Sequence, residues 1–148
     1  MNPRRSFLVA AAAAPVLIAS RRVAAQVDPL DPQVWVVTGG RKVTPGRVTL
    51  ELPQLAENGN SVPMKVSVQS PMSAADHVQA IHLFSEKNPV RNMASFHLGP
   101  RAGRAEVSSR IRLAGTQRIH AVAALSDGTF WSDTREIVVS IAACTDGT

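Results

Sequence analysis

A strict alternation of residue types over residues 105–113 constrains the fold of this chain more than any other feature. Every second position holds an apolar or small residue, namely Ala105, Val107, Ser109, Ile111 and Leu113. The positions between them hold Glu, Ser and Arg. A period of two is that of a β-strand with one face toward a core and the other toward water. The segment is therefore predicted to be a strand with one wet face.

Similar patterns recur along the chain and are separated by turn residues. Further strands are predicted at 48–52, 62–68, 78–85, 94–98, 118–126, 129–131 and 135–141. Glu57-Asn58-Gly59-Asn60 is predicted to form a turn, and Asp127-Gly128 favours a tight hairpin turn. A short helical turn capped by Asp31 is expected at Pro32. The sequence thus predicts an all-β fold, an immunoglobulin-like β-sandwich of seven or eight strands, with a small barrel as the alternative.

The first 25 residues have the composition of an export signal. Arg4-Arg5 precede an apolar run from Ala10 to Ala19, which is shorter than a membrane span of about 20 residues. Small residues around Ala25 suit signal-peptidase cleavage. We interpret 1–25 as a twin-arginine signal peptide, 26–141 as the sandwich domain and 142–148 as a flexible C-terminal arm. The expected location is periplasmic.

Net charge excludes two classes of partner once the leader is removed. The whole chain has 16 Lys and Arg against 11 Asp and Glu, and four of the arginines lie in residues 1–25. The remaining 12 basic and 11 acidic residues give a net charge of +1. Nucleic acid and anionic membrane are therefore not expected as partners, because each requires a basic surface on the folded domain.

The single cysteine, Cys144, lies three residues after the last predicted strand. Its neighbours are small or polar, whereas a cysteine kept for packing normally has apolar neighbours. One cysteine cannot form an internal disulfide, so the thiol of an exported protein is free, joined to another chain or chemically occupied. An extended tail would hold the sulfur about 10 Å beyond the end of the domain.

Several short motifs, taken in order, resemble the SoxY family of bacterial sulfur carriers. The resemblance covers nearly all of the chain after the leader and includes the terminal cysteine. The motifs are Val48-Thr49-Leu50-Glu51-Leu52-Pro53, Ala56-Glu57-Asn58-Gly59, Val62-Pro63, Ser70-Pro71-Met72, Asn88-Pro89, Ser109-Arg110-Ile111-Arg112-Leu113, Thr116-Gln117 and Ser126-Asp127-Gly128-Thr129-Phe130.

The resemblance implies a non-catalytic carrier that takes part in periplasmic thiosulfate oxidation. Its sulfur substrate would be joined covalently to Cys144, with no other cofactor. The implied partners are a SoxZ-like subunit that forms a heterodimer, Sox c-type cytochromes, a sulfate-releasing hydrolase and a sulfur dehydrogenase. A thiol suits this role because sulfur forms S–S bonds and releases them again under nucleophilic attack.

The arm departs from the pattern Gly-Gly-Cys-Gly-Gly that is usual in this family. Ala142 and Ala143 stand in place of the first two glycines, and Thr145, Asp146 and Gly147 follow the cysteine. Alanine and threonine reach positive φ only at a steric cost that glycine avoids, so a stiffer arm is expected. A carboxylate at Asp146 should disfavour the thiolate and repel anionic thiosulfate. A divergent SoxY-like paralogue is therefore a further interpretation.

Two other functions remain open from the residues alone. One is an exported binding or assembly module without thiol chemistry. The other is a metal-trafficking protein that uses Cys144 and the histidines His77, His82, His97 and His120. None of the histidines forms a His-x-His or His-x-x-x-His pair, so their spacing does not support a metal site. The arginines on either side of Ile111 are a further hypothesis, as a site that attracts anionic sulfur species or an acidic partner.

Overall fold

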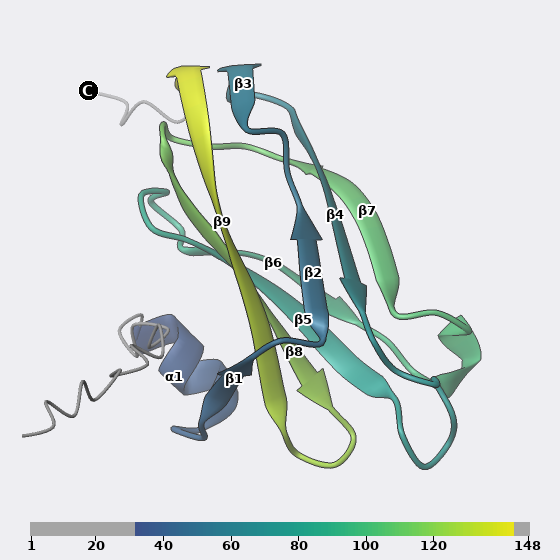
Figure 1. The fold of residues 1–148 in the computed structure, drawn as a ribbon. Coiled ribbons are helices and arrows are strands. Elements are labelled where there is room, and N and C mark those ends of the chain that lie inside the picture. The colour runs from purple at the N-terminus through teal and green to yellow at the C-terminus, as the bar shows by residue number, and fades with distance from the viewer. Residues whose placement is uncertain (1–31, 144–148) are drawn as a thin grey trace, which may run out of the picture.

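Two packed β-sheets and one short helix make up the computed structural model, which describes residues 32–143 (Figure 1). In chain order its elements are α1 (Pro32–Thr38), β1 (Val43–Pro45), β2 (Val48–Glu51), β3 (Leu55–Asn58), β4 (Val62–Val68), β5 (Val78–Ser85), β6 (Asn92–His97), a 3-10 helix (Pro100–Ala102), β7 (Glu106–Ile111), β8 (Gln117–Leu125) and β9 (Phe130–Ile141). The predicted all-β sandwich is confirmed.

The described residues contain nine strands, whereas the sequence predicts seven or eight. Residues 129–131 and 135–141, predicted as two strands, belong to the single long strand β9. The additional strands β1 and β3 have three and four residues and no clear alternation. Strands this short have too few residues to show an alternating pattern. They are recognised only by their hydrogen bonds to strand β9, which is distant in sequence.

The larger sheet has the order β1-β9-β8-β5-β6, and the smaller has the order β2-β4-β7. In the larger sheet β3 also pairs with β9. Both β1 and β3 run parallel to β9, β1 beside its beginning and β3 beside its end. All other pairs are antiparallel. Strand β9 is followed directly by the C-terminal segment. Its pairing with β3 therefore fixes the position at which that segment begins.

The core lies between the two sheets and consists mainly of branched aliphatic side chains. Fully buried members include Val62, Val66, Ile81, Leu83, Leu113, Ile119 and Ile137. The alternation predicted for 105–113 holds at both ends, since Ala105, Ile111 and Leu113 are buried while Arg110 and Arg112 are exposed. In the middle it is weaker, because Val107 is half-buried and Ser109 is exposed. The strand itself ends at Ile111, and Leu113 continues the buried face beyond it.

Helix α1 covers part of the outer face of the larger sheet. Its Val34 and Val37 pack on a second, smaller cluster formed by Phe84, Val122 and Phe130. This explains why β5 is buried at nearly every position, because the core covers one of its faces and α1 covers part of the other. The short helix at Pro32 is as predicted, whereas the expected cap Asp31 lies outside the described residues.

Two turns show how closely the sequence specifies its local structure. Residues 126–128 form the predicted hairpin turn between β8 and β9, and Gly128 has a φ of +81°. The predicted turn at 57–60 is partly wrong, because Glu57 and Asn58 belong to β3 and the turn begins at Gly59. The Asn58 side chain accepts a bond from the Asn60 N–H at 2.9 Å, which closes this turn.

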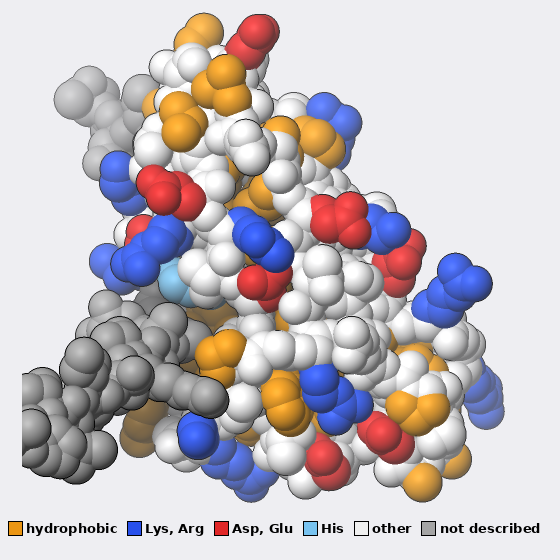
Figure 2. All heavy atoms as spheres, viewed as in Figure 1, with side chains coloured by type: hydrophobic (Ala, Val, Ile, Leu, Met, Phe, Trp, Pro, Cys, Tyr) orange, Lys and Arg blue, Asp and Glu red, His pale blue; other side chains and the backbone are white. Residues whose placement is uncertain are grey.

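Charged side chains of both signs are interspersed over the face in Figure 2, and no single-sign stripe crosses it. None of the helices within residues 32–143 has the length and apolar character required to cross a membrane.

Candidate functional site

Strand β9 carries the chain to the predicted arm. Its Ile137 and Val139 are buried, whereas Ile141, the last residue of the strand, is 63 % exposed. Of the predicted site residues, Ala142 and Ala143 are described, and Cys144, Thr145, Asp146 and Gly147 lie outside the described residues. The site is therefore the root of the arm, meaning residues 141–143, together with the residues that contact it.

Three backbone hydrogen bonds hold the root of the arm. The Gly59 N–H donates to the Ile141 carbonyl at 2.7 Å, and the Leu113 N–H donates to the Gly59 carbonyl at 2.9 Å. The Ala143 N–H in turn donates to the Leu113 carbonyl at 3.0 Å. The backbone is thus held up to Ala143, and Cys144 is the next residue in the sequence.

Gly59 makes this arrangement possible because nothing larger fits. A Cβ at this position would lie 2.5 Å from the Leu113 carbonyl oxygen and 3.1 Å from that of Ile141. Both neighbours are backbone atoms that hydrogen bonds hold in place. The sequence predicted a turn at Asn58-Gly59. It did not predict the contacts of Gly59 with the backbone near residues 113 and 143, because those residues are distant in sequence.

A polar cluster of Asn88 with the buried Ser85 and Gln117 holds the backbone beside Leu113. The Asn88 side chain donates to the Arg112 carbonyl at 2.8 Å and accepts from the Ala114 N–H at 2.9 Å. Gln117, which is 3 % exposed, binds Asn88 and accepts bonds from the Ser85 hydroxyl and the Lys87 N–H. The backbone that receives Ala143 is therefore held on both sides of Leu113.

A mostly apolar groove of about 430 Å³ lies between β6 and β7, the edge strands of the two sheets. Its lining includes Phe96, Ile111 and Val90, with Arg110 and Arg112. The Arg110 guanidinium donates to the Ser61 hydroxyl at 2.6 Å and to the Ser61 carbonyl at 3.2 Å. The groove reaches Arg112, the neighbour of Leu113, so it borders the root of the arm.

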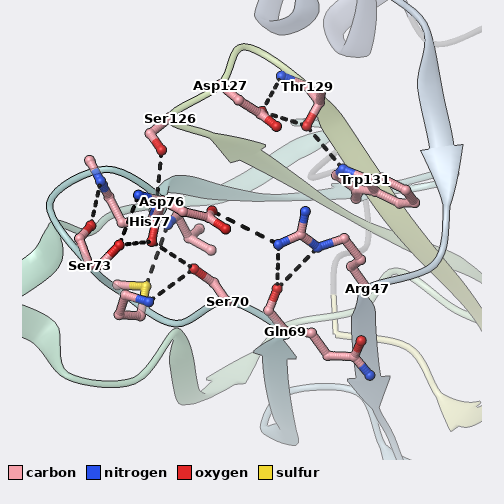
Figure 3. A network of polar contacts seen from close by, with 12 residues as sticks. Arg47, Gln69, Ser70, Ser73, Asp76, His77, Ser126, Asp127, Thr129 and Trp131 are labelled. Atoms are coloured by element: carbon pink, nitrogen blue, oxygen red, sulfur yellow. Dashed lines mark hydrogen bonds and ion pairs between the residues drawn. The ribbon is translucent and has the colours of Figure 1, made fainter.

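The aspartates and serines at the opposite end of the sandwich stabilise turns (Figure 3). Asp127 accepts bonds from the hydroxyl and the N–H of Thr129, which lower the pKa of its carboxyl. The Ser126 hydroxyl accepts from the backbone N–H of His77, while the His77 ring lies 3.1 Å from the Ser73 carbonyl oxygen. These contacts do not form a Ser-His-Asp arrangement, in which the serine must bond the imidazole.

Three of the four histidines share the outer face of the larger sheet. The rings of His82 and His97 are 6.3 Å apart, and His120 binds the Thr134 hydroxyl on β9. Among the described residues no group of three or more His, Cys, Asp or Glu side chains is placed to hold a metal. Burial, together with the charge of His97, lowers the pKa of His82.

This lowered pKa predicts a pH dependence of stability. The unfolded chain takes up a proton at His82 near the usual pKa of 6.5, whereas the folded chain takes it up only at lower pH. Because proton binding is linked to unfolding, lowering the pH from about 7.5 to about 5.5 should reduce the free energy of unfolding of the wild type. The reduction should be smaller in a His82→Gln variant, which lacks this imidazole. Urea denaturation at the two pH values measures both losses, and equal losses would contradict the assignment.

One family profile and several solved structures match this chain. The family profile described as "Sulfur oxidation protein SoxY" matches residues 36–144, so the matched region extends to Cys144. A search of curated proteins found no match. Among solved structures, the sulfur carrier protein SoxY from Chlorobium limicola f thiosulfatophilum is similar, with a TM-score of 0.62 and 28 % identity. The match covers 74 % of this chain and 94 % of that one.

Two superoxide reductases have a similar fold. That from Ignicoccus hospitalis has a TM-score of 0.56 at 20 % identity, over 64 % of this chain and 80 % of that chain. That from Nanoarchaeum equitans has a TM-score of 0.54 at 14 % identity, over 65 % and 100 % respectively. At these identities the likeness concerns the fold alone.

Proposed function

The chain belongs to the SoxY family of sulfur oxidation proteins, and from this membership we propose that it is a covalent sulfur carrier in thiosulfate oxidation, with its substrate attached to the thiol of Cys144. The observation that carries the proposal is the position of this residue. The family match extends to Cys144, and Cys144 follows directly on a backbone that three hydrogen bonds hold against the fold.

The proposed cycle begins with an oxidation. The thiol and thiosulfate form an S–S bond, giving a cysteine S-thiosulfonate, and the thiol proton and two electrons leave, the electrons passing to the c-type cytochromes. Water then cleaves the terminal S–S bond, which releases sulfate and leaves a persulfide on Cys144. Further oxidation by a sulfur dehydrogenase and hydrolysis regenerate the thiol. All of these bonds form at sulfur, where S–S exchange and stepwise oxidation are accessible.

In this scheme the chain presents the substrate and other proteins perform the chemistry. An unperturbed cysteine with a pKa near 8.5 is only a few per cent thiolate at neutral pH, so activation is assigned to the active site of each partner. We propose a SoxZ-like subunit as the heterodimer partner, and the periplasm, reached by twin-arginine export, as the location. No cofactor other than the sulfur adduct is proposed.

The alanines of the arm fit a carrier with a short reach. Where the usual family sequence has two glycines before the cysteine, this chain has Ala142 and Ala143. The Ala143 N–H donates to the Leu113 carbonyl. The greater backbone freedom of glycine at positions 142 and 143 would weaken this hydrogen bond. We propose that partners approach the fold closely to reach Cys144, and that the arm does not swing far from it.

The intact mass of the mature protein tests the proposal. Protein isolated without reductant from cells that are oxidising thiosulfate should carry mass additions of sulfur or sulfite units. Reductant should remove them, and the freed thiol should then accept one alkyl group. A fully alkylatable, unmodified Cys144 from such cells would contradict the proposal and favour the exported binding module. A bound metal that is lost on alkylation of Cys144 would instead favour metal trafficking.

A further inference from the structure

Two exposed apolar side chains, those of Leu55 and Val138, share one face of the sheet near the root of the arm. Leu55 is 55 % exposed, Val138 is 47 % exposed and Ile141 is 63 % exposed. Leu55 and Val138 are partners in the parallel register of β3 and β9, and Ile141 ends β9. Ile141 continues the alternation of the buried Ile137 and Val139, so it lies on the other face of β9 from Val138. We call Leu55 and Val138, which share one face, the arm-root patch. Figure 2 shows apolar and acidic side chains together over the ends of β3 and β9.

The patch is not explained by the folding of the described residues. The outward face of a sheet that borders water normally carries polar side chains, yet the two facing positions here are leucine and valine. Apart from Ile141, the other large exposed apolar residues of the described chain lie elsewhere, with Trp35 and Val36 on α1 and Val90 beyond β5. Contiguous exposed apolar side chains are typical of surfaces that bind another protein.

Two carboxylates border the patch on the same face. Glu57 lies two residues after Leu55 on β3, and Glu136 lies two residues before Val138 on β9, so strand alternation directs each pair to one side. Both carboxylates are exposed. Arg118 on β8 is the register partner of Glu136 and offsets its charge, so among the described residues the unmatched negative charge at the border is that of Glu57. An apolar centre with an acidic border complements a surface with apolar side chains bordered by lysine or arginine.

The reach of Cys144 determines what covers the patch. Consecutive Cα atoms are about 3.8 Å apart, so the Cα of Cys144 lies within that distance of the Cα of Ala143. Ala143 is held to Leu113 and is only two residues from Ile141. An enzyme whose active site encloses the sulfur must therefore bring the rim of that site against the end of β9.

On the basis of the proposed carrier function, we propose that the arm-root patch is the docking surface for the enzymes that act on Cys144. Each such enzyme meets the patch with an apolar rim bordered by basic side chains. A permanently bound subunit at the same place would cover the root of the arm and prevent access to the thiol. The occupant is therefore a transient partner that dissociates after each step.

The test uses the full mature protein, with its second subunit where they copurify, loaded at Cys144. Tetrathionate supplies the adduct, because the thiolate displaces thiosulfate from it and retains the other thiosulfate unit. The sulfate-releasing hydrolase of the same bacterium is the probe, and released sulfate gives kcat and KM. The variants are the double variant Leu55→Gln/Val138→Thr and the single variant Glu57→Lys. Val36→Thr on α1 is the matched control, since it makes the same change at a side chain that is 74 % exposed.

We expect the double variant to raise KM by about tenfold, which corresponds to about 1.4 kcal/mol of lost binding, with kcat unchanged at saturation. Glu57→Lys should raise KM more at low salt than at high salt, because screening weakens the charge contact. The rate of alkylation by iodoacetamide should be the same in all variants, since the thiol itself is untouched. Val36→Thr should behave as wild type.

Two results would overturn the docking surface while leaving the carrier function in place. One is a wild-type KM for both patch variants. The other is loss of the second subunit on size-exclusion chromatography, which would assign the patch to the permanent interface. If the loaded wild-type protein releases no sulfate with the hydrolase, the carrier function fails and the docking surface with it.

Discussion

Replacing Cys144 with serine is expected to reduce carrier-dependent thiosulfate oxidation to the background of an assay without carrier. Serine has nearly the same size, so the fold should be unchanged, but a hydroxyl cannot form the S–S bonds on which the proposed cycle depends. Cytochrome c reduction by thiosulfate, in a periplasmic extract that lacks the native carrier and is supplemented with purified protein, measures the effect.

The neighbouring substitution Thr145→Ala is the control, because it alters the same segment and retains the thiol. It should keep a rate well above background. Circular dichroism and the thermal midpoint should agree between the serine variant and the wild type. A serine variant that still supports thiosulfate oxidation would show that the sulfur is not carried at Cys144.

The second large effect is expected at Gly59. In Gly59→Ala the new Cβ would lie 2.5 Å from the Leu113 carbonyl oxygen, so the backbone at the root of the arm must shift. Overpacking of this kind costs about 1–3 kcal/mol of unfolding free energy. The shift also weakens the bonds that Gly59 makes with Ile141 and Leu113, and through Leu113 the bond to Ala143.

Urea denaturation should show the lower stability, and amide hydrogen exchange should be faster at Ala143 and Leu113 than in the wild type. Gly99→Ala is the matched control. A Cβ there meets nothing within 4 Å, and the φ of −150° at Gly99 is ordinary extended backbone. If the two alanine variants are equally stable, Gly59 does not have the role assigned to it.

The sheets themselves could be predicted because each long strand has a pattern of its own. Alternation at 105–113 indicated which residues face the core, and the mostly apolar run at 78–85 indicated a central strand. The position of the only cysteine, and the order of the short motifs, indicated the family. These features can be read locally, since each depends on residues that are close in sequence.

Other features depend on contacts between distant segments and could not be predicted. The parallel strand β3 was partly interpreted as a turn, because four residues beside Asn58-Gly59 have no period to recognise. The clustering of three histidines on one face of the larger sheet was also not predicted, since His82, His97 and His120 lie on three different strands. The hydrogen bond from the Ala143 N–H to the Leu113 carbonyl was not predicted either, since the two residues are distant in sequence.

The sequence by itself determined the all-β sandwich, its core-facing positions and the membership of the SoxY family. Only the tertiary structure decided that Gly59 and Leu113 hold the root of the arm, and that Leu55 and Val138 form an exposed apolar pair near it. The physical reason is that alternation records which face of a strand is buried, whereas it contains no information about which distant strand becomes its neighbour.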